Sequence, residues 1–172
     1  MGSLIEELAA RLTADATLVG TLGGNGYSGI LNGGVWTRPL RREAPGATLE
    51  AFYDASFGGK VMRDGVATIV DRGDVPHAQR RAIPSAYESY PTIYLYAGAT
   101  STGKATIIAA RKRIFELLDH HASDGWTFVT DDGPLAFVEY VDRIGIQNSE
   151  EFPEAVFDQC RYRVTSRVAS LV

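Results

Sequence analysis

Apolar residues that recur every three or four positions predict a helix at the start of the chain. Its apolar face consists of Leu4, Ile5, Leu8 and Leu12. Ser3 and Glu6 have the spacing of a capping box, in which each side chain reaches the backbone amide of the other. A short helical turn is expected to restart at Asp15, and it carries Leu18, Val19 and Leu22. The glycines that follow permit positive φ and predict a loop.

The clearest helical pattern covers about 102–122. Its apolar stripe is made of Ile107, Ala110, Ile114, Leu117 and His121, widened by Ile108, Phe115 and Leu118. Asp124-Gly125 predicts its end. This segment is therefore expected to be a long amphipathic helix with one face against a core.

Short apolar runs and period-two alternation predict strands elsewhere. Residues 92–97 are apolar on both faces, which is typical of a central strand. Further strands are expected at 30–40, 126–129, 135–146 and 155–168. In 135–146 one face carries Ala136, Val138, Tyr140, Ile144 and Ile146, interrupted by Asp142. In the last strand the inward positions are Val156, Cys160, Tyr162, Val164 and Val168.

Residues 41–91 interrupt this order and are expected to be a long excursion from the core. Pro45, Pro76, Pro84 and Pro91 prevent long regular elements there. A hairpin is predicted in which Asp64-Gly65 joins 61–63 to 66–70. The complete order predicts one α+β domain over 1–172. Its mainly antiparallel sheet is backed by the N-terminal helix and the long helix.

Composition narrows the class of protein. Apolar residues make up 45% and charged residues 22%, and the net charge is −4, which argues against a broadly basic nucleic-acid coat. Cys160 is the single cysteine, so an intrachain disulfide and a cysteine-based metal site are both excluded. No secretion signal is recognised and no apolar run approaches the roughly 20 residues of a membrane span. The protein is expected in a reducing cytoplasm, or in a particle assembled there.

Gly98-Ala99-Thr100-Ser101-Thr102-Gly103-Lys104-Ala105 comes within one residue of the phosphate-binding loop G-x-x-x-x-G-K-[ST]. Ala105 stands where a hydroxyl should hold Mg²⁺, and no further βα units follow. We interpret the segment as a helix start in which Ser101 or Thr102 caps the first turn. The alternative is a nucleotide-binding protein that uses Gly98, Gly103 and Lys104.

No catalytic or metal-ligating set is found, so the protein is expected not to be an enzyme and to need no cofactor. The chain has no G-x-S-x-G motif. His77, His120 and His121 do not have the spacing of a ligand set, because adjacent helical residues point about 100° apart. Asp131-Asp132 belongs to a turn between strands, and Cys160 is interpreted as a small core residue.

The candidate interface residues are basic or aromatic. Arg161, Arg163 and Arg167 share one face of the last strand, where Glu139 on a neighbouring strand could neutralise them. The functional interpretation is a subunit contact, since arginine suits ion pairs at interfaces. In the excursion, the candidates are Arg63, Arg80, Arg81 and Tyr87.

With these residues in place, the chain resembles the tail terminator and tail-completion proteins of long-tailed bacteriophages. The likeness lies in the helix through Leu12 with Asp15-x-x-Leu18 and Leu22-Gly23-Gly24, in a strand ending at Arg38-Pro39-Leu40, in Tyr90-Pro91-Thr92-Ile93-Tyr94-Leu95-Tyr96, and in Gln159-Cys160-Arg161-Tyr162-Arg163-Val164. Segment 41–91 departs from the family because it is longer than a compact member would have.

The resemblance implies a structural virion protein in the tail or neck. Its subunits would form a ring, usually a hexamer, that caps the completed tail tube and joins the tail to the head-connector protein. DNA would pass through the lumen without sequence-specific binding, and no membrane would be involved. Another neck or minor tail component is the alternative within the same class.

Overall fold

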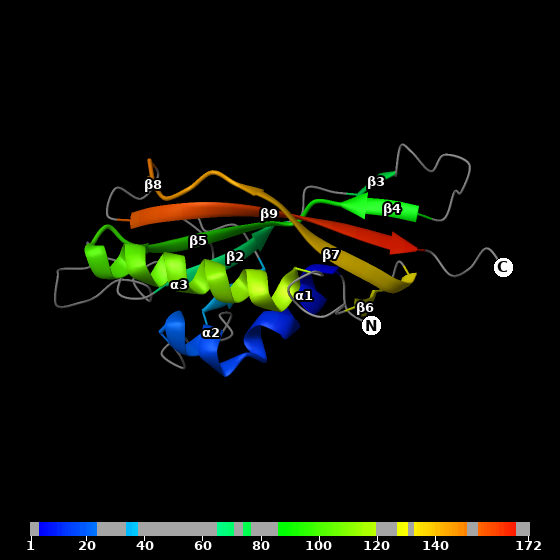
Figure 1. The fold of residues 1–172 in the computed structure, drawn as a ribbon, viewed down its shortest axis with the longest axis horizontal. Helices are drawn as coiled ribbons and strands as arrows, with labels where there is room; N and C mark the ends of the chain where they lie inside the picture. Colours follow the sequence, from blue (N-terminus) through cyan, green and yellow to red (C-terminus); the bar gives the residue numbers. More distant parts are fainter. Residues whose placement is uncertain are drawn as a thin grey trace, which may run out of the picture.

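The computed structural model describes residues 4–23, 34–37, 65–70, 74–76, 86–119, 127–130, 133–150 and 155–167. Three helices lie on one face of a long, twisted sheet (Figure 1). The helices are α1 (Leu4–Thr13), α2 (Ala16–Thr21) and α3 (Ser101–Leu118). The strands are β1 (Val35–Trp36), β2 (Val66–Val70), β3 (Asp74–Pro76), β4 (Ala86–Ser89), β5 (Thr92–Gly98), β6 (Thr127–Thr130), β7 (Gly133–Arg143), β8 (Gln147–Asn148) and β9 (Ala155–Arg167).

Strand β9 runs the length of the sheet and organises it (Figure 1). The sheet order is β1-β2-β5-β9-β4-β3, and β7 and β8 pair with β9 while β6 pairs with β7. The pairs made by β9 are all antiparallel, whereas β1 and β2 are parallel. The predicted α+β class with a mainly antiparallel sheet is confirmed.

The core lies between the helices and one face of the sheet. Buried residues come from all three helices and from β1, β2, β5, β7 and β9; those below 2% exposure include Leu8, Leu12, Leu18, Ile69, Ile93, Ile107, Ile114 and Tyr162. In β9 the residues from Val156 to Val164 at every second position are buried and the intervening ones are half-buried. The sheet therefore has a helix-covered face and an open face that none of the described helices covers.

The N-terminal prediction is confirmed for the described residues. Leu4, Leu8 and Leu12 are the buried residues of α1; Ser3 lies outside the described residues. A second helix begins after Asp15, as predicted. The Asp15 carboxylate caps α2 by accepting a hydrogen bond from the Leu18 amide at 2.7 Å.

Helix α3 is shorter than its pattern predicted. It ends at Leu118, where Asp119 leaves the helical conformation with ψ 124°. The Asp119 carboxylate accepts from the Tyr140 amide of β7 at 2.8 Å, so the helix end is held to the sheet. Ile108 and Phe115 are 48% and 38% exposed, because the sheet covers a narrower stripe of helix α3 than its apolar pattern predicted. His121 and Asp124-Gly125 lie outside the described residues.

Part of the expected excursion belongs to the core. Strand β2 pairs with β1 on one edge and with β5 on the other, and its Val66, Ala67 and Ile69 are fully buried. The two pairings are long-range, so local turn signals did not reveal them. The expected hairpin partner, 61–63, lies outside the described residues.

Strand β7 ends earlier than predicted and contains a bulge. The register shifts between Tyr140 and Asp142, and an extra residue at such a point reverses the alternation of faces. Ile144 is therefore 49% exposed instead of sharing the face of Val138. In the part of the chain that is described, no helix is long and apolar enough to cross a membrane.

Candidate functional site

Residues 98–105, which resemble a phosphate-binding loop in sequence, form the capped start of helix α3. The Thr100 hydroxyl accepts from the Gly103 amide at 3.0 Å, and the Thr100 amide donates to the Gly98 carbonyl at 2.7 Å. A Cβ at position 103 would lie 1.9 Å from the Gly98 oxygen, so the second glycine is required for this close approach. The cap is Thr100, not Ser101 or Thr102 as predicted, because α3 begins one residue earlier.

The surroundings of this segment differ from those of a phosphate-binding loop. Strand β5 lies between β2 and β9 and is antiparallel to both, whereas nucleotide-binding folds of this kind place the loop after a parallel strand. The Gly103 amide, one of those that would face a phosphate, is already bonded to Thr100. Lys104 is exposed on the first turn of α3. These contacts favour the helix-start interpretation.

The arginines of β9 are paired with carboxylates of β7 on the open face. Arg163 Nε donates to Glu139 Oε2 at 3.0 Å, as the sequence suggested. Arg161 forms an ion pair with Asp142, a partner that sequence reasoning missed. All four side chains are at least 30% exposed, so each pair contributes little to stability. The third arginine, Arg167, lies opposite Leu135 in the ladder, and its side chain lies outside the described residues.

The other predicted interface residues are only partly visible. Tyr87 lies in β4, opposite Ser166 of β9 and Pro76 of β3, and its side chain is not among those described. Arg63, Arg80 and Arg81 lie outside the described residues. Whether these four residues form contacts between subunits stays a prediction.

Aromatic side chains extend the open face next to the arginine pairs. The rings of Tyr94 and Tyr96 stack with centroids 6.4 Å apart, and those of Tyr96 and Phe157 with centroids 5.9 Å apart. All three side chains are half-buried. Aromatic residues and arginine together are typical of protein interfaces.

A buried carboxylate connects the sheet to α3. Asp158 is fully buried on the helix-covered face, where its Oδ2 accepts from Arg111 at 2.8 Å. Its Oδ1 accepts from the amides of Gly145 at 3.1 Å and Gln159 at 2.8 Å. Sequence reasoning left Asp158 out of the inward positions, although the alternation of β9 places it there. These contacts tie β9 to α3 and to the segment that follows β7.

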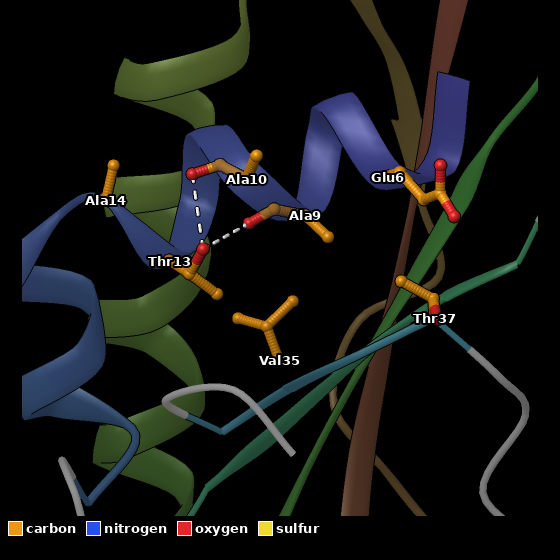
Figure 2. A pocket seen from close by; sticks show the side chains of 7 residues that line it. All are labelled: Glu6, Ala9, Ala10, Thr13, Ala14, Val35 and Thr37. Carbon is orange, nitrogen blue, oxygen red and sulfur yellow. Dashed lines mark hydrogen bonds between the residues drawn. The ribbon is translucent and has the colours of Figure 1, made fainter. Parts of the chain in front are cut away.

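The described residues line two grooves on the helix side of the sheet. The α1–β1 groove has a volume of about 410 Å³ and is lined by Glu6, Ala9, Ala10, Thr13, Ala14, Val35 and Thr37. Figure 2 shows Val35 opposite Thr13, with Glu6 and Thr37 at one end. The Thr13 hydroxyl donates to the carbonyls of Ala9 and Ala10 at 2.9 and 3.2 Å. This groove therefore offers small side chains and one carboxylate, without a nucleophile–base pair.

The second groove, which we name the α3–β7 groove, has a volume of about 320 Å³. It is lined by Ile108, Arg111, Lys112, Phe115, Tyr140, Arg143 and Tyr162. Phe115 meets Tyr140 edge-on with centroids 5.6 Å apart, and Tyr140 meets Tyr162 in the same way at 5.8 Å. Burial raises the pKa of both tyrosines, so they are neutral phenols. The groove thus combines apolar walls with cationic side chains.

Cys160 is a core residue, as predicted. It is buried and unpaired as a thiol, and burial raises its pKa to about 12. A thiol of this kind is a poor nucleophile at neutral pH. Among the described residues, no three histidine, cysteine, aspartate or glutamate side chains gather where they could hold a metal ion.

No protein-family model and no curated protein matches the chain. Ten chains of solved structures match it in fold. One of them comes from the virion of a native gene transfer agent particle, with a TM-score of 0.56 and 15% sequence identity. The match covers 96% of this chain and 96% of that chain. At this identity the likeness concerns the fold.

Proposed function

We propose that this protein is a structural component of a phage-like virion and that it acts by binding, not by catalysis. The supporting observation is the fold likeness to a chain of a gene transfer agent virion, which covers nearly all of both chains. The sequence patterns that resemble tail terminator proteins support the same class independently.

Within that class, we propose a tail terminator. Its subunits form a closed ring, with six copies as the expected number, that caps the tail tube and ends its elongation. The other side of the ring binds the head-connector protein, and DNA passes through the lumen without sequence readout. A ring of one chain needs a heterologous contact, in which two different surfaces of each subunit meet. The open sheet face and the α3–β7 groove are candidates for such surfaces.

Native mass spectrometry and negative-stain imaging of the purified protein test this proposal. Closed rings, or a monomer that forms rings only on tail tubes, are the expected result. Deletion of the gene from the genome that encodes the particle should yield tail tubes of uncontrolled length that lack heads. A protein that stays monomeric on tubes and is absent from purified particles would contradict the proposal.

A different neck or minor tail component is the second candidate, because the fold likeness is to a virion chain and does not specify a position in the particle. Imaging of labelled protein in intact particles separates the two. A terminator lies at the head-proximal end of the tail tube, whereas a minor tail component lies elsewhere along it.

The nucleotide-binding alternative has its own test. Calorimetric titration with ATP or GTP and Mg²⁺ should give no heat of binding at millimolar nucleotide. Binding that Lys104→Ala abolishes would revive the alternative and would remove the purely structural role.

A further inference from the structure

We propose that the α3–β7 groove is the docking site for an acidic segment of a different protein of the particle, in which one aromatic or large aliphatic side chain is flanked by carboxylates. This inference rests on the proposed structural role in a virion and names the chemistry of one partner. It assigns the groove, one of the two candidate contact surfaces, to a different chain and not to a second copy of this one.

The walls of the groove expose apolar surface. Ile108 and Phe115 lie seven residues apart on one face of α3 and expose 48% and 38% of their surface. Tyr140, whose ring meets Phe115 edge-on, is half-buried beside them. The volume of about 320 Å³ is at the lower end for ligand pockets, which measure roughly 300–1,000 Å³. The groove therefore suits one or two side chains of a peptide segment.

The charge of the groove is positive. Among the described residues that line it, Arg111, Lys112 and Arg143 are cationic and none is a carboxylate. Arg111 is bound to Asp158. Lys112 and Arg143 are exposed, and neither forms an ion pair with another described residue. Two cations are thus available to the carboxylates of an occupant, and complementary charge of this kind sets its register and its rate of association.

The bulge in β7 brings Arg143 to this groove. Without it, regular alternation would place position 143 on the open face with Glu139. The register shift after Tyr140 instead sets Arg143 opposite Cys160, a buried position of the helix-covered face, and turns Asp142 to the other face. The same shift thus removes a carboxylate from the groove and supplies a cation.

The lining also contains an unpaired polar atom. The Tyr162 hydroxyl is buried and has no hydrogen-bond partner among the described residues, and a buried donor without an acceptor is unfavourable. A carboxylate that enters beside the half-buried Tyr140 ring supplies the missing acceptor. The chemistry of the groove therefore favours an apolar side chain with acidic neighbours.

A second copy does not present such a segment within the part of the chain that the structure describes. The exposed large apolar residues of that part are Ile108, Phe115, Val141 and Ile144. The first two belong to the groove itself, and the other two lie within two residues of Arg143. None of the four is set among carboxylates without a cation nearby, so charge complementarity favours a different chain as the occupant.

Calorimetric titration of the full-length protein with a defined peptide tests the inference. The probe is an acetylated and amidated pentapeptide with phenylalanine at its centre and glutamate at the other four positions. We expect saturable binding at low ionic strength, and added salt should weaken it. A peptide with alanine at the centre, or with lysine in place of the glutamates, should give no heat of binding at the same concentrations.

Variants of the protein locate the binding site. Lys112→Glu with Arg143→Glu should weaken binding at least about 10-fold, because like charges then face each other. Lys104→Glu is the matched control, since it reverses an exposed lysine of the same helix outside the groove, and it should bind as the wild type does. Tyr162→Phe should weaken binding about 3-fold or more without lowering the denaturation midpoint, because it removes a buried hydroxyl that has no partner in the empty groove.

Two outcomes would overturn the inference and leave the structural role standing. The first is a wild-type protein that does not bind the peptide, as when the chain's own residues fill the groove, or a double charge reversal that binds it equally well. The second is the loss of rings in the double charge reversal by native mass spectrometry, because the groove would then bind a second copy. Absence of the protein from purified particles contradicts the proposed function instead, whatever the peptide does.

Discussion

Arg111 of α3 and Asp158 of β9 form an ion pair in which Nη1 lies 2.8 Å from Oδ2. The Asp158 side chain is fully buried, and that of Arg111 is 22% exposed. Two backbone amides, from Gly145 and Gln159, complete the environment of the carboxylate. The pair links the helix layer to the long strand that organises the sheet, so it fixes how the two layers sit together.

Loss of the Asp158 carboxylate should destabilise the protein strongly. Asp158→Ala leaves Arg111 and two amides without their acceptor, and we expect the free energy of unfolding to fall by about 3 kcal/mol. Urea denaturation followed by circular dichroism measures it. The exposed pair Arg161–Asp142 provides the control, since Arg161→Ala should cost less than about 1 kcal/mol. Equal effects of the two substitutions would contradict the structural role assigned to the buried pair.

Asp15 combines a helix cap with an ion pair, and the two contributions can be separated. Its carboxylate accepts from the Leu18 amide at 2.7 Å and from Arg113 Nη2 at 2.6 Å. We expect Asp15→Ala to lower the free energy of unfolding by about 1 kcal/mol through the lost cap. Asp15→Asn keeps a capping oxygen and should cost less. A larger loss for the asparagine variant would show that the cap is not the main contribution.

The same residue predicts a dependence on pH. The hydrogen bond from Arg113 is the main cause that holds the pKa of Asp15 below its usual value. A depressed pKa stabilises the folded state fully above the unfolded value of about 3.9, and this contribution disappears as the pH falls through the folded pKa. The stability difference between wild type and Asp15→Asn should therefore shrink below about pH 4. Thermal unfolding at pH 7 and pH 3 measures it, and a difference that stays constant would contradict this interpretation.

Alanine substitutions at two helical glycines should change the stability of the protein in opposite directions. At Gly103 a Cβ would lie 1.9 Å from the Gly98 carbonyl oxygen, whereas at Gly20 nothing lies within 4 Å. Gly103→Ala should therefore destabilise the protein by about 2 kcal/mol or more, since the start of α3 must move away from β5. Gly20→Ala should raise stability by about 0.5 kcal/mol, because alanine is the better helix former. The denaturation midpoints of the two variants measure both effects. A Gly103→Ala variant as stable as the wild type would contradict the close contact between the start of α3 and Gly98.

Cys160 should be unreactive in the folded protein. Its thiol is buried and its pKa is raised to about 12, so the thiolate is scarce at pH 8. A thiol reagent such as DTNB should modify it slowly in buffer and rapidly in 6 M guanidinium chloride, which exposes it. Rapid labelling without denaturant would show that β9 opens locally.

The elements with strong local periodicity were predicted well. The stripe of Ile107, Ala110 and Ile114 predicted α3, and the alternation around Tyr162 and Val164 predicted the last strand, because a face that packs on a core leaves its period in the sequence. The candidate pair Glu139 and Arg163 could also be inferred from two neighbouring strands. In these cases the signal lies within one segment or between adjacent ones.

What the sequence could not supply was decided by contacts between distant segments. Strand β2 belongs in the sheet because its edges meet β1 and β5. The partner of Arg161 depends on where β7 bulges, and the length of α3 depends on Asp119 meeting Tyr140. No residue pattern within one element specifies these partners.

The sequence by itself therefore determined the helices, the longer strands and their buried faces, since each follows from the spacing of apolar residues along one segment. Only the tertiary structure decided that Asp158 is neutralised by Arg111 and that Arg143 turns toward α3. Both depend on which side chains long-range packing brings together across the helix and sheet layers.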